Sequence, residues 1–114
     1  MFRIVIGGKV LTPATSNVGA MLTIQPQAPS ASQLFVFQDS HLINVESGLA
    51  ITVDEDGSVT MTEKKDFNAA QKWTKQGECL VNTYWDMALT CEGTVVKGEE
   101  CVDKIGQRFA LKNE

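Results

Sequence analysis

A short motif recurs at nearly constant spacing along this chain of 114 residues. Each copy has a glutamine, any residue and then a large aromatic, and successive copies lie 38 and 36 residues apart. The copies are Gln33 with Phe35, Gln71 with Trp73, and Gln107 with Phe109. A second motif, an aliphatic residue followed by threonine, marks the same units at Thr12, Thr52 and Thr90. Two motifs in one register indicate a threefold internal repeat, with units at about residues 1–40, 41–77 and 78–114 that form a single domain.

Each repeat divides into four short segments that are typical of β-strands and are separated by turn residues. The alternation of Val59, Thr60, Met61 and Thr62 indicates a strand with one buried face. Gly57 before this strand favours a hairpin turn, because glycine accepts positive φ without steric cost. The predicted strands cover residues 2–6, 9–12, 20–25 and 34–38, then 41–44, 50–53, 58–63 and 72–76, and finally 79–82, 87–91, 94–97 and 108–112.

Twelve short strands in three four-stranded units predict an all-β fold of the β-trefoil type. Six strands close a small barrel and three hairpins cover one end of it, which leaves few exposed sheet edges. We expect the motif aromatics Phe35, Trp73 and Phe109 in a core that all three repeats share. Since a side-chain amide both donates and accepts hydrogen bonds, we expect the motif glutamines to satisfy backbone groups in the neighbouring loops.

Charge and hydropathy exclude several kinds of partner. The net charge is −4 and the chain has no run of Lys and Arg, which argues against nucleic acid. No apolar stretch approaches the roughly 18 residues of a membrane span, so we expect no membrane insertion. The N-terminal residues carry one arginine and a very short apolar run, unlike a secretory signal. We therefore expect a protein that is cytoplasmic, or secreted without a visible signal peptide.

The three cysteines and the single histidine give little support to metal binding or catalysis. Cys79, Cys91 and Cys101 are an odd number without metal-binding spacing, and His41 stands alone. We expect free thiols in a reducing compartment, with a bridge between Cys91 and Cys101 as the alternative. No nucleophile is paired with a base and no glycine-rich phosphate loop is present, so we expect neither an enzyme nor a cofactor.

The three Q-x-W/F motifs, with residues 44–53 leading the second repeat, resemble the ricin B-chain type (R-type, Q-x-W) β-trefoil lectins. The likeness covers nearly the whole chain and is strongest over residues 41–77. It implies a small carbohydrate-binding protein that recognises glycans or glycoproteins non-covalently through its repeat loops. Weak single sites would gain avidity from several sites per chain or from a homo-oligomer. Because protease inhibitors also use this fold, the alternative is a protein-binding trefoil that has lost sugar binding.

In that family an acidic residue ends the second strand of a repeat, an aromatic lies on or after the third strand, and an amide precedes the motif glutamine. The resemblance places the acidic position at Thr12, Thr52 and Thr90, the aromatic position at Thr23, Met61 and Lys97, and the amide position at Ser32, Ala70 and Gly106. No repeat carries the full set, so the chain departs from the galactose-binding pattern. Other kinds of glycan binding stay open.

Repeat two offers substitutes for the missing polar groups. Asp54 and Asp56 follow its second strand, and Glu63, Asp66 and Asn68 precede its motif. We predict that Asp54, Asp56 and Asn68 supply carboxylate and amide contacts to a polyol. The competing interpretation is an acidic hairpin and loop that only face water.

Repeat three has two adjacent aromatics, Tyr84 and Trp85, in the turn between its first and second strands. Since two neighbouring side chains in a turn cannot both enter one core, we expect at least one of them on a binding surface. Asp86 and Glu92 are close enough in sequence to add polar contacts beside it. The competing interpretation is an aromatic that folds down to plug the end of the barrel.

Overall fold

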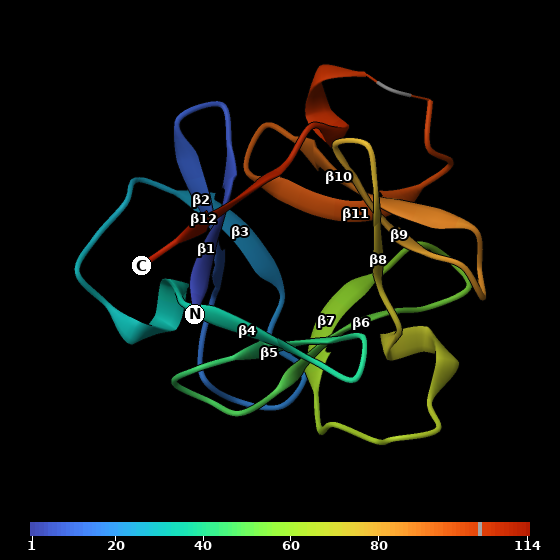
Figure 1. The fold of residues 1–114 in the computed structure, drawn as a ribbon, viewed down its shortest axis with the longest axis horizontal. Helices are drawn as coiled ribbons and strands as arrows, with labels where there is room; N and C mark the ends of the chain where they lie inside the picture. Colours follow the sequence, from blue (N-terminus) through green and yellow to red (C-terminus); the bar gives the residue numbers. More distant parts are fainter. Residues whose placement is uncertain (103) are drawn as a thin grey trace.

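The computed structural model describes residues 1–102 and 104–114 and has the β-trefoil architecture predicted from the repeats. Figure 1 shows three lobes of similar build around a common centre, with the two chain ends close together. The strands are β1 (Phe2–Ile6), β2 (Lys9–Pro13), β3 (Leu22–Gln25), β4 (Phe35–Gln38), β5 (His41–Asn44), β6 (Ala50–Val53), β7 (Val59–Thr62), β8 (Thr74–Gln76), β9 (Cys79–Asn82), β10 (Met87–Glu92), β11 (Val95–Glu99) and β12 (Ala110–Asn113). Every predicted strand is present, and the ends differ by at most two residues.

The last strand of each repeat pairs antiparallel with the first strand of the next. β4 pairs with β5, β8 pairs with β9, and β12 returns to pair with β1. The register of the closing pair places Phe2 opposite Asn113 and Val5 opposite Ala110. This cyclic pairing closes the barrel, as the repeat pattern predicts.

Each motif glutamine ends a single 3-10 turn, an element that the sequence pattern did not predict. These turns are η1 (Ala31–Gln33), η2 (Ala69–Gln71) and η3 (Ile105–Gln107). The Gln71 amide oxygen accepts a hydrogen bond from the Lys65 backbone N–H at 2.8 Å, and its nitrogen donates to the Glu63 carbonyl at 2.7 Å. Gln33 bonds in the same way to Ala28 and Pro26, and Gln107 to Val102 and Glu100. The glutamines therefore satisfy loop backbone groups, which confirms their predicted role.

The core lies on the axis that relates the three repeats. Phe35, Trp73 and Phe109 are 0%, 2% and 1% exposed and belong to one apolar cluster with residues from every repeat. Burying an aromatic or branched side chain of this size contributes roughly 1.5–3 kcal/mol. The Trp73 indole N–H also donates to the Ile51 carbonyl at 2.9 Å. The turn before each fourth strand thus directs a motif aromatic inward, which explains why β8 and β12 begin after that aromatic.

Both sequence interpretations of the cysteines are wrong. A disulfide joins Cys79 to Cys101, whose Cα atoms lie 6.8 Å apart, and Cys91 keeps a free thiol. The pairing follows from the trefoil geometry, because the Phe109 N–H donates to the Glu78 carbonyl at 2.9 Å. This bond brings the end of repeat three back to its beginning, where Cys79 lies. Cys91 is closer than Cys79 to Cys101 in the sequence, so spacing along the chain favours the wrong partner for Cys101.

No helix in the part of the chain that the structure describes has the length and apolar character that a membrane span requires.

Candidate functional site

A cavity of about 480 Å³ in repeat two gathers several of the polar residues that the sequence singles out. We call it the repeat-two pocket, and its lining residues are Val18, Thr52, Asp54, Thr62, Glu63, Lys65 and Asn68. Thr52 lies on β6, Thr62 lies on β7, and Asn68 is the N-cap residue of η2. Val18 comes from the β2–β3 loop of repeat one. The structure therefore brings the predicted residues Asp54 and Asn68 together in one cavity.

Asp54 presents an unpaired carboxylate to this pocket. Its backbone is fixed at a hairpin turn, where its N–H donates to the Ser58 carbonyl and its carbonyl accepts from the Gly57 N–H, both at 2.9 Å. Its side chain is exposed and has no hydrogen bond or ion pair among the residues that the structure describes. The carboxylate is therefore free to accept hydrogen bonds from a ligand.

Asn68 is held in place by its role as a helix cap. Its side-chain oxygen accepts from the Ala70 N–H at 3.0 Å, as expected for an asparagine at an N-cap. Its side-chain nitrogen has no partner within the described residues, so two amide hydrogens are available to the pocket. Asp54 and Asn68 thus offer an acceptor and a donor from two fixed pieces of backbone.

The threonines at the acidic position of the resemblance are structural. Thr12, Thr52 and Thr90 are 8%, 6% and 0% exposed, and each hydroxyl donates to the carbonyl two residues earlier in its own strand. The Thr52 oxygen also lies 2.6 Å from the Thr62 hydroxyl and accepts from the Gln71 amide at 3.2 Å. The hydrogen-bonding capacity of the Thr52 hydroxyl is therefore largely filled by the protein.

The aromatic position assigned to Met61 corresponds to a core residue. Met61 is fully buried, and the ladder places Thr60 opposite Thr52, just as Thr23 lies opposite Thr12 and Lys97 opposite Thr90. Repeat two has one more residue between its third strand and the motif glutamine than the other repeats. For this reason the residue ten positions before the motif glutamine of repeat two is Met61, one residue beyond Thr60, which is the equivalent of Thr23 and Lys97. A shift of one residue in a strand moves a side chain to the opposite face.

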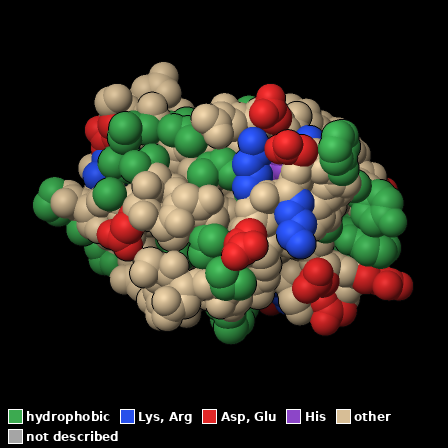
Figure 2. All heavy atoms as spheres, turned by 90° about the horizontal axis from the view of Figure 1, so that it is seen from below, with side chains coloured by type: hydrophobic (Ala, Val, Ile, Leu, Met, Phe, Trp, Pro, Cys, Tyr) green, Lys and Arg blue, Asp and Glu red, His purple; other side chains and the backbone are tan. Residues whose placement is uncertain are grey.

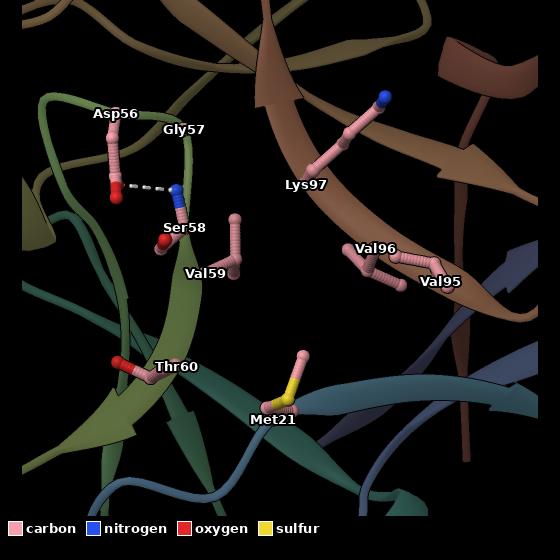
Figure 3. Close-up of a pocket in the computed structure, with 9 residues that line it drawn as sticks. All are labelled: Met21, Asp56, Gly57, Ser58, Val59, Thr60, Val95, Val96 and Lys97. Atoms are coloured by element: carbon pink, nitrogen blue, oxygen red, sulfur yellow. Dashed lines mark hydrogen bonds between the residues drawn. The ribbon is translucent and has the colours of Figure 1, made fainter.

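Asp56 lies in a different cavity from Asp54. This axial pocket, of about 320 Å³, forms where the third strands of the repeats meet. Backbone bridges join Met21 to Thr60, Ser58 to Lys97, and Val95 to Thr23 around the axis. Figure 3 shows the Asp56 carboxylate turned toward the Ser58 N–H, which donates to it at 2.9 Å. This hydrogen bond holds the pKa of Asp56 below its usual range and commits the side chain to its own turn.

Of the two turn aromatics in repeat three, only Tyr84 is exposed. Tyr84 is 62% exposed, whereas Trp85 is half-buried and packs against the core cluster. Their rings meet edge to face with centroids 4.6 Å apart. The Trp85 indole nitrogen is buried without a hydrogen-bond partner among the described residues. The expectation that at least one aromatic is exposed holds for Tyr84, while Trp85 folds down as the competing interpretation describes.

Asp86 completes the turn that follows these aromatics. Its φ is +55°, in the left-handed region, and the glycines at the corresponding turns, Gly8 and Gly48, have φ values of +77° and +73°. Aspartate tolerates this conformation better than most residues, so the backbone geometry accounts for its presence. Asp86 is exposed and does not line the repeat-two pocket.

Glu92 occupies the position in repeat three that Asp54 occupies in repeat two, two residues after the buried threonine. Its carboxylate lies 3.2 Å from the Lys97 ammonium and 3.9 Å from that of Lys104. Both lysines also approach Glu99, at 3.8 and 3.5 Å. The hydrogen bond and charge of Lys97 hold the pKa of Glu92 below its usual range. In repeat three the charge of the Glu92 carboxylate is therefore balanced by two lysines. Lys104 occupies the N-cap position of η3, where repeat two has Asn68.

Repeat one lacks both groups. Ala14 follows the buried threonine by two residues, as Asp54 does in repeat two, and the η1 cap is Ser30 where repeat two has Asn68. Among the described residues, an unpaired carboxylate and a capping amide thus occur together in repeat two and in neither of the other repeats.

The structure offers no nucleophile paired with the histidine within the described residues. His41 is fully buried, and its ring nitrogens lie 2.9 and 3.1 Å from the carbonyl oxygens of Asp39 and Lys65. The free Cys91 thiol donates to the Gly93 carbonyl at 3.2 Å, and burial raises its pKa. Within the described residues no cluster of three or more His, Cys, Asp or Glu could hold a metal ion.

Sequence reasoning missed Thr62, Lys65, Val18 and Phe67 around the repeat-two pocket. Strand alternation with Thr60 could have identified Thr62. Val18 belongs to another repeat, and only the fold brings it there, because the Gly19 N–H donates to the Met61 carbonyl at 2.7 Å. Lys65 and Phe67 lie in a loop whose path depends on the Gln71 hydrogen bonds.

Figure 2 shows a face on which acidic, basic and hydrophobic side chains are interspersed. The basic side chains on this face do not form one continuous patch, in agreement with the negative net charge.

Solved structures with this fold include sugar-binding proteins. No protein-family model matches the sequence, and no curated protein matches it either. The chain is similar to the β-trefoil lectin of the Vibrio vulnificus hemolysin/cytolysin with N-acetyl-D-lactosamine bound, at 18% identity and a TM-score of 0.83 over 97% of this chain and 94% of that chain. It is also similar to the C-half of the earthworm R-type lectin in complex with GalNAc, at 18% identity and a TM-score of 0.85 over 99% and 98% of the two chains.

A designed threefold-symmetric protein, ThreeFoil, matches as well, at 18% identity and a TM-score of 0.84 over 99% and 98% of the chains. The chain is a β-trefoil. At this level of identity the similarity establishes the fold, and the function has to be argued from the site.

Proposed function

We propose that this protein binds carbohydrate non-covalently, as a small lectin, through the repeat-two pocket. The observation that carries the proposal is the pairing of an unpartnered Asp54 carboxylate with the capping amide of Asn68 in one cavity of about 480 Å³. The pocket lies beside Thr52, where the resemblance to R-type lectins expects a sugar contact. The sugars bound to the two lectins of the same fold add support.

The chemistry of the pocket suits a polyol. Each sugar hydroxyl both donates and accepts, so it can bridge a carboxylate and an amide N–H. Hydrogen bonds to a charged group are roughly twice as strong as neutral ones, which makes Asp54 the main polar anchor. Glu63 and Lys65 add one negative and one positive group at the edge. With so few contacts in an open pocket, we expect affinity of about millimolar order for a single sugar.

We further propose that only repeat two binds. Repeat three pairs its carboxylate with two lysines, and repeat one has alanine at that position. A chain with one site gains avidity only when several copies are displayed together. Tight binding to a surface dense in glycans should then require a homo-oligomer, or several copies of the protein immobilised side by side.

A glycan array tests this proposal with matched variants. Asp54→Asn keeps the shape of the side chain and removes its charge, whereas Asp56→Asn makes the same change in the axial pocket. We expect the wild type and Asp56→Asn to bind the same glycans and Asp54→Asn to lose them. Equal binding by all three proteins would show that the site lies elsewhere.

A protein-binding trefoil is the second candidate, and the exposure of Tyr84 favours it. The phenol ring, 62% exposed on a turn braced by Trp85, could serve as an interface anchor. Under this alternative, Tyr84→Ala would abolish binding to a protein target and free sugar would not compete.

We also propose that the protein functions in an oxidising compartment. The disulfide between Cys79 and Cys101 supports this proposal, because such bonds persist in secreted proteins and are reduced in the cytosol. Thiol titration of the protein isolated from its native source tests it. One reactive thiol per denatured chain is expected, and three would contradict the proposal.

A further inference from the structure

Phe67 is the most exposed of the large hydrophobic side chains in the described part of the chain. Its exposed fraction is 99%, compared with 47% for Phe37, and the motif aromatics are nearly fully buried. A phenyl ring in this position contributes nothing to the packing of the fold. Aromatic side chains, phenylalanine included, are enriched at recognition surfaces, which makes this ring a candidate ligand contact.

The turn that carries Phe67 lies directly beside the repeat-two pocket. Lys65, two residues before it, and Asn68, the next residue, both line that pocket. The Asn68 N–H donates to the Lys65 carbonyl at 3.1 Å, which closes the turn with Phe67 inside it. Phe67 therefore lies in the chain between two residues that line the pocket, although its own side chain is not part of the lining.

This turn is held from several sides. Gln71 accepts from the Lys65 N–H at 2.8 Å, and the buried His41 ring lies 3.1 Å from the Lys65 carbonyl. The Gln71 N–H donates to the Asn68 carbonyl at 3.0 Å, and the Asn68 side chain caps η2. Because the backbone on both sides of Phe67 is bonded to the core, binding a ligand there costs little backbone entropy.

The β7 strand of repeat two has no aromatic side chain that could face a sugar. Its residues are Val59, Thr60, Met61 and Thr62, of which Val59 and Met61 are buried. The second apolar group at the pocket is Val18, which is 61% exposed and comes from repeat one. The pocket thus combines a polar interior with apolar groups at and beside its edge. A pyranose ring has the same division, with hydroxyl groups at its edge and C–H groups on its faces.

Resting on the function proposed above, we propose that Phe67 stacks on the C–H face of a pyranose whose hydroxyl groups bind Asp54 and Asn68. The site then selects cyclic sugars over open-chain polyols. An alditol offers the same hydroxyl groups to Asp54 and Asn68 but has no ring face for Phe67. Removing the phenyl ring abolishes this preference and leaves the polar contacts in place.

The variants Phe67→Ala, Phe67→Tyr and Phe37→Ala separate stacking from a general loss of exposed aromatic surface. Phe37 lies on β4 and does not line the pocket, so Phe37→Ala is the matched control. Since Phe67 is fully exposed, its replacement should leave the melting temperature unchanged. The probes are an array that includes GalNAc and N-acetyl-D-lactosamine, and competition by each retained sugar and by its alditol.

We expect Phe67→Ala to lose about tenfold in affinity and to lose the preference for the sugar over its alditol. Phe67→Tyr and Phe37→Ala should bind like the wild type. If Asp54→Asn abolishes binding while Phe67→Ala binds as the wild type does, stacking is refuted and the proposed function stands. If the wild type binds no glycan on the array, or if Asp54→Asn binds the same glycans as the wild type, the proposed function and the stacking role fail together.

Discussion

The motif glutamine of repeat two should contribute more to stability than the motif glutamine of repeat one. Gln71 is fully buried and bonds to the Lys65 N–H, the Glu63 carbonyl and the hydroxyls of Thr62 and Thr52. Gln71→Met keeps the volume of the side chain and removes these bonds. It leaves the Lys65 N–H and the Glu63 carbonyl without their partner, and it also removes the amide that donates to the hydroxyls of Thr62 and Thr52. At about 1–3 kcal/mol for each unsatisfied group, the free energy of unfolding should fall by about 3 kcal/mol.

The same substitution in repeat one is the control. The side chain of Gln33 bonds only to Ala28 and Pro26 among the described residues, with no link to a threonine hydroxyl. Chemical denaturation should therefore rank Gln71→Met as the more destabilised variant, and its melting temperature should fall by on the order of 10 °C. Gln71→Met should also weaken glycan binding, because Lys65 and Thr62 line the pocket. Equal stabilities of the two variants, or a loss below about 1 kcal/mol, would refute this account of the motif.

Three further predictions concern stability. In calorimetry, Trp73→Phe should destabilise the protein more than Trp85→Phe. The first substitution removes a hydrogen bond to the buried Ile51 carbonyl, whereas the second removes an N–H that has no partner among the described residues. Cys79→Ser should lower the denaturation midpoint by an amount equivalent to roughly 2–4 kcal/mol, and a reducing agent should then have no further effect. Glu92→Gln should be less stable than the wild type at neutral pH, because the pKa of Glu92 is lowered in the folded state and its ionised form is stabilised. That difference in stability should be fully present above pH 4.5, the ordinary pKa of a glutamate, and should disappear as acidification protonates Glu92 in the folded protein. It should also shrink in high salt. A pH-independent difference would contradict the ion-pair explanation.

The fold was predictable because its determinants are local and repeated. The spacing of Gln33, Gln71 and Gln107 marks three equivalent loops, and each loop must satisfy the same backbone groups. Strand alternation and turn residues then define the twelve strands without knowledge of the tertiary contacts. The 3-10 turns could not be predicted because a single turn is too short to show a repeating pattern of hydrophobic residues.

The pocket was only partly predictable. Asp54 and Asn68 could be identified because both are polar residues next to recognisable elements of repeat two. The separation of Asp54 from Asp56 could not be predicted, because it depends on which way each side chain leaves the hairpin turn. Val18 comes from another repeat, and the bond between Cys79 and Cys101 depends on the return of repeat three to its starting point. These features follow from tertiary geometry, which neither composition nor spacing reports.

Amide chemical-shift mapping with free GalNAc, followed by each glycan that the array retains, tests the central claim most directly. We predict saturable shifts for Asp54, Asn68 and their neighbours in repeat two, and little change around Glu92 in repeat three or Asp56 in the axial pocket. Shifts centred on Tyr84, equal shifts in all three repeats, or no shifts with any of these sugars would contradict the proposal that the repeat-two pocket is the carbohydrate site.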